Sequence, residues 1–234
     1  MAEPRSSKQA AGEAAARLVK NGMRLGLGTG STVEFFLQAL AARIQKEGLR
    51  VVGVPTSKAT ADRAEALGIP LADLEHTPEL DLVVDGADEV DDEFRLIKGG
   101  GGALLREKIV AAASKRVVIL IGAGKRVQRL GTTFMLPVEI TPFGQSATRR
   151  KLEELGPCAA FLRIAADGQP FRTDNGNLIL DCRFPKGIAN PSALHRKFSE
   201  TPGVVEVGLF LDLCHAVVEG RDDGSAQIFE RPAT

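Results

Sequence analysis

The stretch RLGLGTGSTVEFFLQALAARIQKEGLRVVGV, residues 24–54, determines the predicted fold. A short apolar segment at 23–28 is typical of a buried strand, and a glycine-bearing turn leads from it into a long segment with helical apolar spacing. Ser31 is placed to cap this helix and Gly48 to end it, and 50–54 is a second apolar strand. Strand, helix and strand in succession predict a right-handed βαβ unit on a parallel sheet.

The same alternation continues through the first half of the chain. The patterns predict further helices at 7–19, 57–68 and 102–114, and further strands at 80–88 and 116–122. The first half is therefore expected to be an α/β domain, with a Rossmann-like, mostly parallel sheet flanked by helices.

The second half has a different order of elements. The expected order is β-α-β-β-α-β, the split-βαβ order of a smaller ferredoxin-like α+β domain, with elements at 136–140, 146–156, 159–164, 177–184, 191–203 and 204–210. A strand at 215–220 could then return to the first sheet. The expected domains are 1–130 plus 211–234 for the Rossmann-like catalytic domain and 131–210 for the ferredoxin-like domain.

The composition excludes several classes of protein. Lys+Arg and Asp+Glu both number 30, and this balance argues against a nucleic-acid or anionic-membrane surface as the main role. No apolar run approaches the ~18 residues of a membrane span, and the N-terminus lacks the apolar core of a signal peptide. Three widely spaced cysteines, Cys158, Cys182 and Cys214, are expected to be buried free thiols. We expect a cytoplasmic protein.

The loop GLGTGST at 26–32 follows a predicted strand and opens a predicted helix. It does not fit the dinucleotide fingerprint, since Ser31 or Val33 stands where the third glycine belongs, and the next strand offers no acid for a ribose hydroxyl. Hydroxyl groups at a helix N-terminus suit a phosphate monoester, and this loop supplies them from Thr29, Ser31 and Thr32. The plain alternative is a tight turn with an ordinary serine cap.

The acidic segment DGADE, 85–89, also follows a predicted strand. Asp85 and Asp88 are three residues apart, so both carboxylates can face one cavity, where they hold hydroxyl groups or move protons. Asp91, Asp92 and Glu93 further along are expected to form a solvated loop. A divalent metal is the alternative for the acids, but neither EF-hand spacing nor a histidine cluster supports it.

The segment KGGGGALLREK, 98–108, places four glycines before a predicted helix. Side chains on a helix tilt toward its N-terminus, so Glu107 can lean back over the glycine loop. A carboxylate base, the Lys98 cation and a backbone pocket at Gly99 to Gly102 are the parts needed to remove a proton beside a carbonyl and hold the enediolate. The alternative is that Glu107 pairs on the surface with a neighbouring cation.

Six motifs occur along the chain in the order GLGTGST, GVPTS, DGADE, LIKGGGGALLREKIV, LPVEITPFG and GVVEVGLF. Together and in register they resemble the ribose-5-phosphate isomerase family of type A, and the resemblance extends over essentially the whole chain. The resemblance implies interconversion of ribose 5-phosphate and ribulose 5-phosphate in the pentose phosphate pathway. It also implies a cytoplasmic homodimer or homotetramer with no metal or organic cofactor.

The resemblance also implies roles for single residues. Glu107 would be the general base that moves a proton between C1 and C2, while Asp85, Asp88 and Lys98 would line the sugar, assist ring opening and stabilise the enediolate. The sugar phosphate would contact further residues, in part through backbone groups: Thr29, Gly30, Ser31, Thr32 and Lys125 at the phosphate, Lys8 as an additional phosphate contact, and Gly86, Ala87, Gly99, Gly100 and Gly101 elsewhere. The three histidines match no catalytic position.

Proteins of other classes stay open as alternatives. A sugar-phosphate sensing module would keep the phosphate loop but would not need Glu107 beside Lys98. An amino-sugar phosphate deaminase would be expected to use a catalytic histidine, and none lies in these loops. A CoA transferase would use a glutamate as nucleophile. Two glycine loops with two tasks fit the isomerase best, because a phosphate gripped away from the reacting carbons positions them for the reaction.

Overall fold

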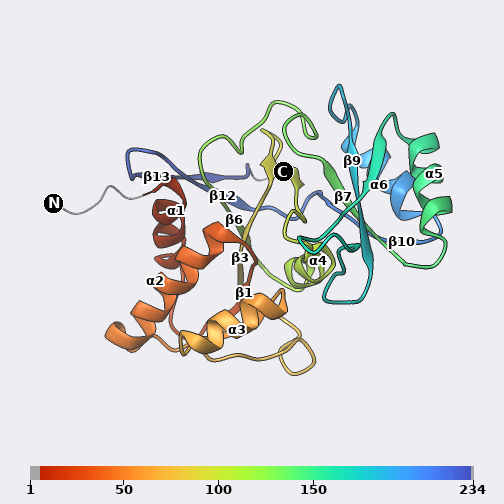
Figure 1. Cartoon of the computed structure of the whole chain (residues 1–234). Helices are drawn as coiled ribbons and strands as arrows, with labels where there is room; N and C mark the ends of the chain where they lie inside the picture. The colour runs from red at the N-terminus through yellow and green to blue at the C-terminus, as the bar shows by residue number, and fades with distance from the viewer. Residues whose placement is uncertain (1–5, 233–234) are drawn as a thin grey trace. The chain divides into compact units, whose positions relative to one another are not determined.

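The computed structural model describes residues 6–232 and divides them into two compact units (Figure 1). The first unit contains the described residues up to Ala87, then Arg106–Lys125 and the residues from Leu213 onward; the second contains Asp88–Leu105 and Arg126–Asp212. The expected domain boundaries differ mainly at 88–105, which belong to the second unit. The reason is that two short strands in this segment pair with each other, and one of them also pairs with a strand near residue 210.

The first unit is built on a six-stranded sheet in the order β13-β12-β6-β3-β1-β2. Five of its strands are parallel, and only β13 pairs antiparallel, with β12. The strands are β1 (Arg24–Leu27), β2 (Val52–Pro55), β3 (Leu82–Gly86), β6 (Val117–Ile121), β12 (Ala216–Gly220) and β13 (Ala226–Glu230). The mostly parallel sheet and the return of a strand near 215–220 are confirmed, and β13 was not predicted.

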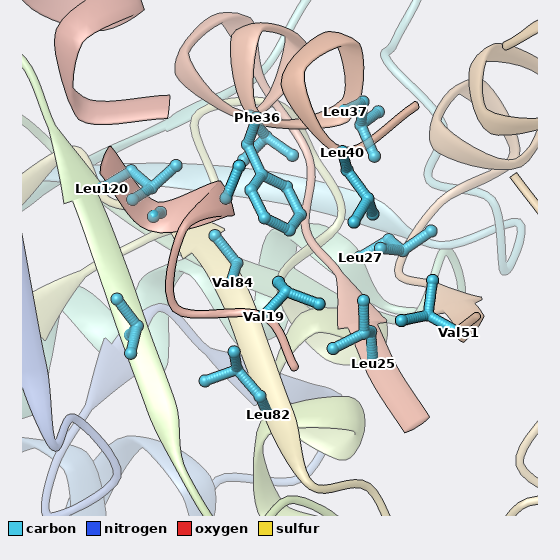
Figure 2. Packing of buried hydrophobic residues seen from close by; sticks show 14 of the residues in the cluster. Val19, Leu25, Leu27, Phe36, Leu37, Leu40, Val51, Leu82, Val84 and Leu120 are labelled. Carbon is cyan, nitrogen blue, oxygen red and sulfur yellow. The ribbon is translucent and has the colours of Figure 1, made fainter. Parts of the chain in front are cut away.

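Helices cover this sheet, and the alternation of side chains along each strand decides what they contact. The helices are α1 (Ser7–Ala16), α2 (Ser31–Glu47), α3 (Lys58–Ala66) and α4 (Leu104–Ala112). Leu25 and Leu27 of β1 pack with Phe36 of α2 in one buried cluster, which Figure 2 shows. Gly26 lies between them in sequence and faces the other way, since a Cβ there would lie 2.6 Å from Cγ1 of Val110 on α4.

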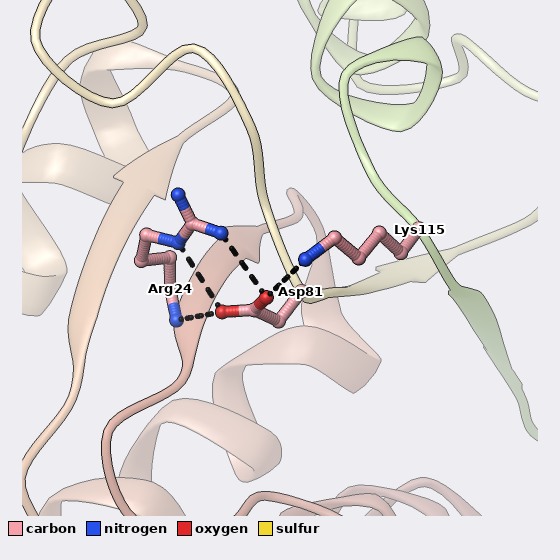
Figure 3. Close-up of polar contacts among 3 residues, drawn as sticks. All are labelled: Arg24, Asp81 and Lys115. Atoms are coloured by element: carbon pink, nitrogen blue, oxygen red, sulfur yellow. Dashed lines mark hydrogen bonds and ion pairs between the residues drawn. The ribbon is translucent and has the colours of Figure 1, made fainter.

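An ion-pair cluster ties together the segments at the amino ends of three neighbouring strands (Figure 3). Asp81 precedes β3 and accepts hydrogen bonds from the backbone and guanidinium of Arg24, at the start of β1. Lys115, just before β6, donates to the same carboxylate over 3.1 Å. Hydrogen bonds from Arg24 are the main reason that the pKa of Asp81 lies well below its ordinary value.

The second unit contains a four-stranded antiparallel sheet in the order β10-β7-β9-β8. Its elements follow the chain as β7 (Leu136–Ile140), α5 (Gln145–Leu155), β8 (Ala159–Leu162), β9 (Leu178–Arg183), α6 (Pro191–Ser199) and β10 (Val204–Val207). With the strands numbered along the chain, this order is 4-1-3-2, the arrangement of a split βαβ repeat. The predicted ferredoxin-like α+β domain is confirmed.

The predicted strand at 204–210 is interrupted at Gly208. Residues 204–207 form β10, whereas β11 (Leu209–Phe210) joins a three-stranded sheet with β5 (Leu96–Ile97) and β4 (Glu89–Val90). A Cβ at Gly208 would lie 2.4 Å from the carbonyl oxygen of Lys98. The break therefore occurs where two backbone segments come too close to admit a side chain.

Helix ends are the other local difference. Gly48 ends α2, as predicted, and has the left-handed conformation, but Gly30 rather than Ser31 is the N-cap. Its φ of 114° is open to glycine and strained for any other residue, so Ser31 becomes the first helical residue. Within residues 6–232 no helix is long and apolar enough to span a membrane.

Candidate active site

Three neighbouring strands of the first unit end in segments that the sequence singled out. β3 pairs with β1 on one side and with β6 on the other, all parallel. Their carboxyl ends lead into the glycine loop (26–32), the acidic segment at Asp85 and the turn before Lys125. Ligands of open α/β sheets bind at this edge.

The glycine loop and the acidic segment are joined by Asp85. This carboxylate is 1% exposed and accepts N–H hydrogen bonds from Thr29 over 3.0 Å and from Gly86 over 2.7 Å. A Cβ at Gly28 would lie 2.2 Å from Oδ1 of Asp85, so the approach requires glycine there. Asp85 thus holds the loop in place, a role that its position in the sequence did not reveal.

The Thr29 side chain points toward hydroxyl groups of α3 and of the short connection between β2 and α3. Its Oγ1 lies 2.8 Å from the hydroxyls of Thr56 and Ser57 and 3.1 Å from that of Thr60. Thr60 in turn donates to the carbonyl of Gly28 over 2.9 Å. The Thr29 hydroxyl was expected to donate to a phosphate, but in the structure its hydrogen bonds anchor the loop. Two of its partners, Thr56 and Ser57, are the last two residues of the GVPTS motif.

The N-terminus of α2 is open to a ligand. Gly30 caps it without any side-chain hydrogen bond, so its first N–H groups are not capped by a side chain. The loop borders a pocket of about 270 Å³ with Gly28, Thr29, Gly30 and Ser31 in its lining. Free N–H groups and the helix dipole together favour an anion at this position.

Cations lie beside this helix end. Nζ of Lys8 donates to Oγ of Ser31 over 2.9 Å, and the Lys8 stem packs against Gly122 at the end of β6. Lys125 directly follows the turn at Ala123 and Gly124 and is partly buried. Arg63 and Glu34, which also line the pocket, form an ion pair, and hydrogen bonds from Arg63 lower the pKa of Glu34.

Glu107 is buried on α4, with 4% of its surface exposed. The alternative of a surface ion pair for this residue is therefore wrong. Val110, three residues later on the same helix face, lies against Gly26 of β1. Glu107 thus lies on the face of α4 that packs under the strand leading into the glycine loop.

In the second unit, Asp88, Lys98 and the four-glycine loop form a connected group. Asp88 accepts the N–H of Gly100 over 2.8 Å, and its own N–H donates to Ile97. Lys98 is 3% exposed and its Nζ lies 5.3 Å from the Phe210 ring centroid. Gly99 and Gly102 have φ of 105° and 82°, values that explain the need for glycine there.

Two acids of the same segment have structural roles that sequence reasoning missed. Glu89 is fully buried and accepts hydrogen bonds from the backbone of Gly131, Thr133 and Phe134. Asp91 was expected to be solvated but is 2% exposed, because it accepts bonds from the backbone and guanidinium of Arg95. The density of acids in the sequence could not separate these two from their exposed neighbours.

The histidines and cysteines lie outside the segments described above, and the expected burial of the cysteines holds for two of the three. Nδ1 of His215 accepts the Val117 N–H, and His76 is an exposed partner of Asp73. All three cysteines are free, with Cys182 and Cys214 buried and Cys158 only partly so. Within the described residues 6–232, no group of three or more His, Cys, Asp or Glu side chains could hold a metal ion.

Residues 52–224 match the family model of ribose 5-phosphate isomerase A (phosphoriboisomerase A). The chain belongs to this family. It is 51% identical over 222 residues to ribose-5-phosphate isomerase A of Synechococcus sp. (strain JA-3-3Ab), with 94% of this chain and 96% of the relative covered. The family assignment made from the six motifs is confirmed.

Solved structures of the family share the whole fold. Ribose 5-phosphate isomerase A of Methanocaldococcus jannaschii is 36% identical, with a TM-score of 0.90 over 96% of this chain and 98% of that one. A D-ribose-5-phosphate isomerase in complex with phospho-erythronic acid is 34% identical, with a TM-score of 0.92 over 96% and 98%. The two-unit α/β architecture is therefore common to these family members.

Proposed function

We propose that this protein interconverts D-ribose 5-phosphate and D-ribulose 5-phosphate in the cytoplasm, as a step of the non-oxidative pentose phosphate pathway. The observation that carries the proposal is identity of about one half, over nearly the full chain, to relatives named as ribose-5-phosphate isomerase A. We also propose that the active form is a homodimer or homotetramer, and that the reaction needs no metal or organic cofactor.

The phosphate of the substrate is assigned to the N-terminus of α2. Gly30, Ser31 and Thr32 offer backbone N–H groups there, with the hydroxyls of Ser31 and Thr32. Thr29 contributes as part of the loop that surrounds the phosphate, and Lys8 and Lys125 add positive charge. The Lys8–Ser31 hydrogen bond supports this assignment, because it places a cation at the open end of the helix. A phosphate bound in this way anchors the substrate away from its reacting carbons.

Glu107 is assigned the proton transfer. Its carboxylate removes the proton from C2 of the open-chain aldose, and the electron pair of that bond forms the C1=C2 bond of an enediolate, with negative charge on the C1 oxygen. A proton then passes from the C2 hydroxyl to the C1 oxygen, and return of the first proton to C1, as the C2=O bond forms, gives the ketose. Burial of Glu107 supports the role, because a carboxylate removed from water is a stronger base toward a carbon acid.

The oxygen atoms of the sugar are assigned to the remaining groups. Lys98 carries the charge that balances the enediolate, and Asp85 and Asp88 accept sugar hydroxyls and assist ring opening. The backbone of Gly86, Ala87 and Gly99 to Gly101 contacts the sugar. The hydrogen bonds that fix Asp85 on Thr29 and Asp88 on Gly100 support these roles, since each carboxylate is held rigidly.

Exchange of hydrogen with solvent tests the proposal directly. Ribose 5-phosphate is incubated with the protein in D₂O and followed by proton NMR. Deuterium should enter at C2 of the aldose and at C1 of the ketose as the two sugars equilibrate. Binding of the sugar phosphate with no exchange and no ketose would instead identify a non-catalytic sensing module.

A further inference from the structure

Arg163 connects the ferredoxin-like sheet to the four-glycine loop, entirely within the second unit. Its Nη1 donates to two carbonyl oxygens of that loop, to Gly99 over 2.9 Å and to Gly100 over 3.0 Å. The rest of its guanidinium faces Asp181, with Nε 2.9 Å from Oδ2 and Nη2 bonded to Oδ1. The Arg163 side chain is 14% exposed and that of Asp181 is 13% exposed.

The strand register explains why this pair forms. Asp181 of β9 is directly opposite Phe161 of β8. Two residues beyond Phe161, the N–H of Arg163 donates to the carbonyl of Ile179, so the antiparallel pairing continues to that point. Arg163 and Asp181 are thus diagonal neighbours on one face of the sheet. The ring of Phe171 lies 5.8 Å from the guanidinium carbon. A planar fork held by a carboxylate and an aromatic ring has little freedom to move.

The hydrogen bonds of Arg163 affect two successive peptide groups. In the Gly99–Gly100 peptide the carbonyl accepts from Arg163 and the N–H donates to Asp88. In the Gly100–Gly101 peptide the carbonyl accepts from Arg163, while the Gly101 N–H donates to no acceptor within residues 6–232. A cation bonded to a peptide oxygen polarises that peptide and makes its N–H a stronger donor.

We propose that Arg163 is a positioning residue for the isomerisation, which holds the glycine loop and strengthens the Gly101 N–H as a donor to the enediolate oxygen. Arg163 acts through the loop and does not itself touch the substrate. The inference rests on the proposed isomerase function and deepens it. An N–H fixed in advance where charge develops stabilises the transition state more than the ground state.

Arg183 provides a matched control. It lies on β9 in the lining of the same groove of about 530 Å³ that Gly100, Arg163 and Asp181 border. Its guanidinium is 5.8 Å from the Phe161 ring centroid, and the structure records no hydrogen bond from it to the glycine loop within the described chain. R163M and R183M each remove one cation from the groove, but only R163M releases the loop.

The experiment compares kcat, KM and inhibition in wild type, R163M, R163K and R183M. We expect R163M to lower kcat about 10²-fold, the lower end of the effect of losing an oxyanion donor, with KM within about threefold. For R183M, both kcat and KM should remain within about threefold of the wild-type values. Phospho-erythronic acid, found in complex with a relative, has a planar carboxylate that is chemically similar to an enediolate. R163M should therefore weaken inhibition by this compound in parallel with kcat, and inhibition by inorganic phosphate should not change.

Lysine at 163 keeps the charge but not the fork, so R163K should lower kcat about tenfold with KM unchanged. R163K also replaces R163M as the test if R163M does not fold, as judged by circular dichroism. Wild-type-like kcat in the folded variant would overturn the inference. Equal loss of affinity for phosphate and phospho-erythronic acid would overturn it too, since it would indicate general disruption. An inactive wild type would refute the proposed function instead.

Discussion

The contact between Gly28 and Asp85 leads to a sharp prediction for Gly28→Ala. The added Cβ would lie 2.2 Å from Oδ1, 2.4 Å from Cγ and 2.5 Å from Cα of Asp85. Carbon atoms in proteins prefer separations of about 3.5–4.0 Å, so β1 and β3 would have to part by about 1 Å at this point. Rotation of the Asp85 side chain cannot relieve the clash, because one of the three atoms belongs to the backbone.

The expected cost combines two effects. Forcing an extra methyl group into a packed site costs about 1–3 kcal/mol. Displacing the Asp85 carboxylate weakens its hydrogen bonds from Thr29 and Gly86, and hydrogen bonds to a charged group contribute about 1.5–3 kcal/mol each. If only part of the stabilisation from these hydrogen bonds is lost, the free energy of unfolding falls by about 3 kcal/mol in total. This corresponds to a Tm lower by about 6–12 °C.

Thermal unfolding followed by circular dichroism measures this effect, since the chain has neither Trp nor Tyr for fluorescence. Gly86→Ala is the matched control for stability. A Cβ at Gly86 meets nothing closer than the Thr29 carbonyl oxygen at 3.6 Å, so its Tm should stay within about 2 °C of wild type. The reasoning is refuted if Gly28→Ala melts as Gly86→Ala does.

Three further predictions concern catalysis, phosphate binding and acid stability. Glu107→Gln should lower kcat at least ~10²-fold with unchanged inhibition by inorganic phosphate, and near-normal turnover would remove Glu107 from the mechanism. Lys8→Met should raise both KM and the phosphate inhibition constant about tenfold; unchanged constants would place the phosphate elsewhere. The pKa of Asp81 is lower in the folded than in the unfolded protein. The ionised Asp81 therefore stabilises the fold fully above its unfolded pKa near 4, and this contribution is lost as the pH falls from there through the folded pKa. Asp81→Asn should therefore lower Tm at pH 7 but flatten its decline between about pH 5 and pH 2, and an equally steep decline would contradict this.

Much of the fold follows from local patterns in the sequence. Apolar residues at helical or strand spacing occupy positions within a few residues of one another, so the order of elements in both halves could be predicted. The glycine that ends α2 and the glutamate one turn inside α4 are likewise local features. The six motifs, taken together, also allowed the family to be predicted.

Only the tertiary structure decided which polar groups meet. Asp85 and Thr29 are 56 residues apart, and Arg163 and Gly99 are 64 apart, so no periodicity connects either pair. Burial separates Glu89 and Asp91 from their exposed acidic neighbours, because it depends on what packs against them from elsewhere in the chain. The sequence by itself determined the elements and the candidate residues. The pairing of distant strands determined that Asp85 braces one glycine loop and Arg163 the other, since both contacts arise from strand register.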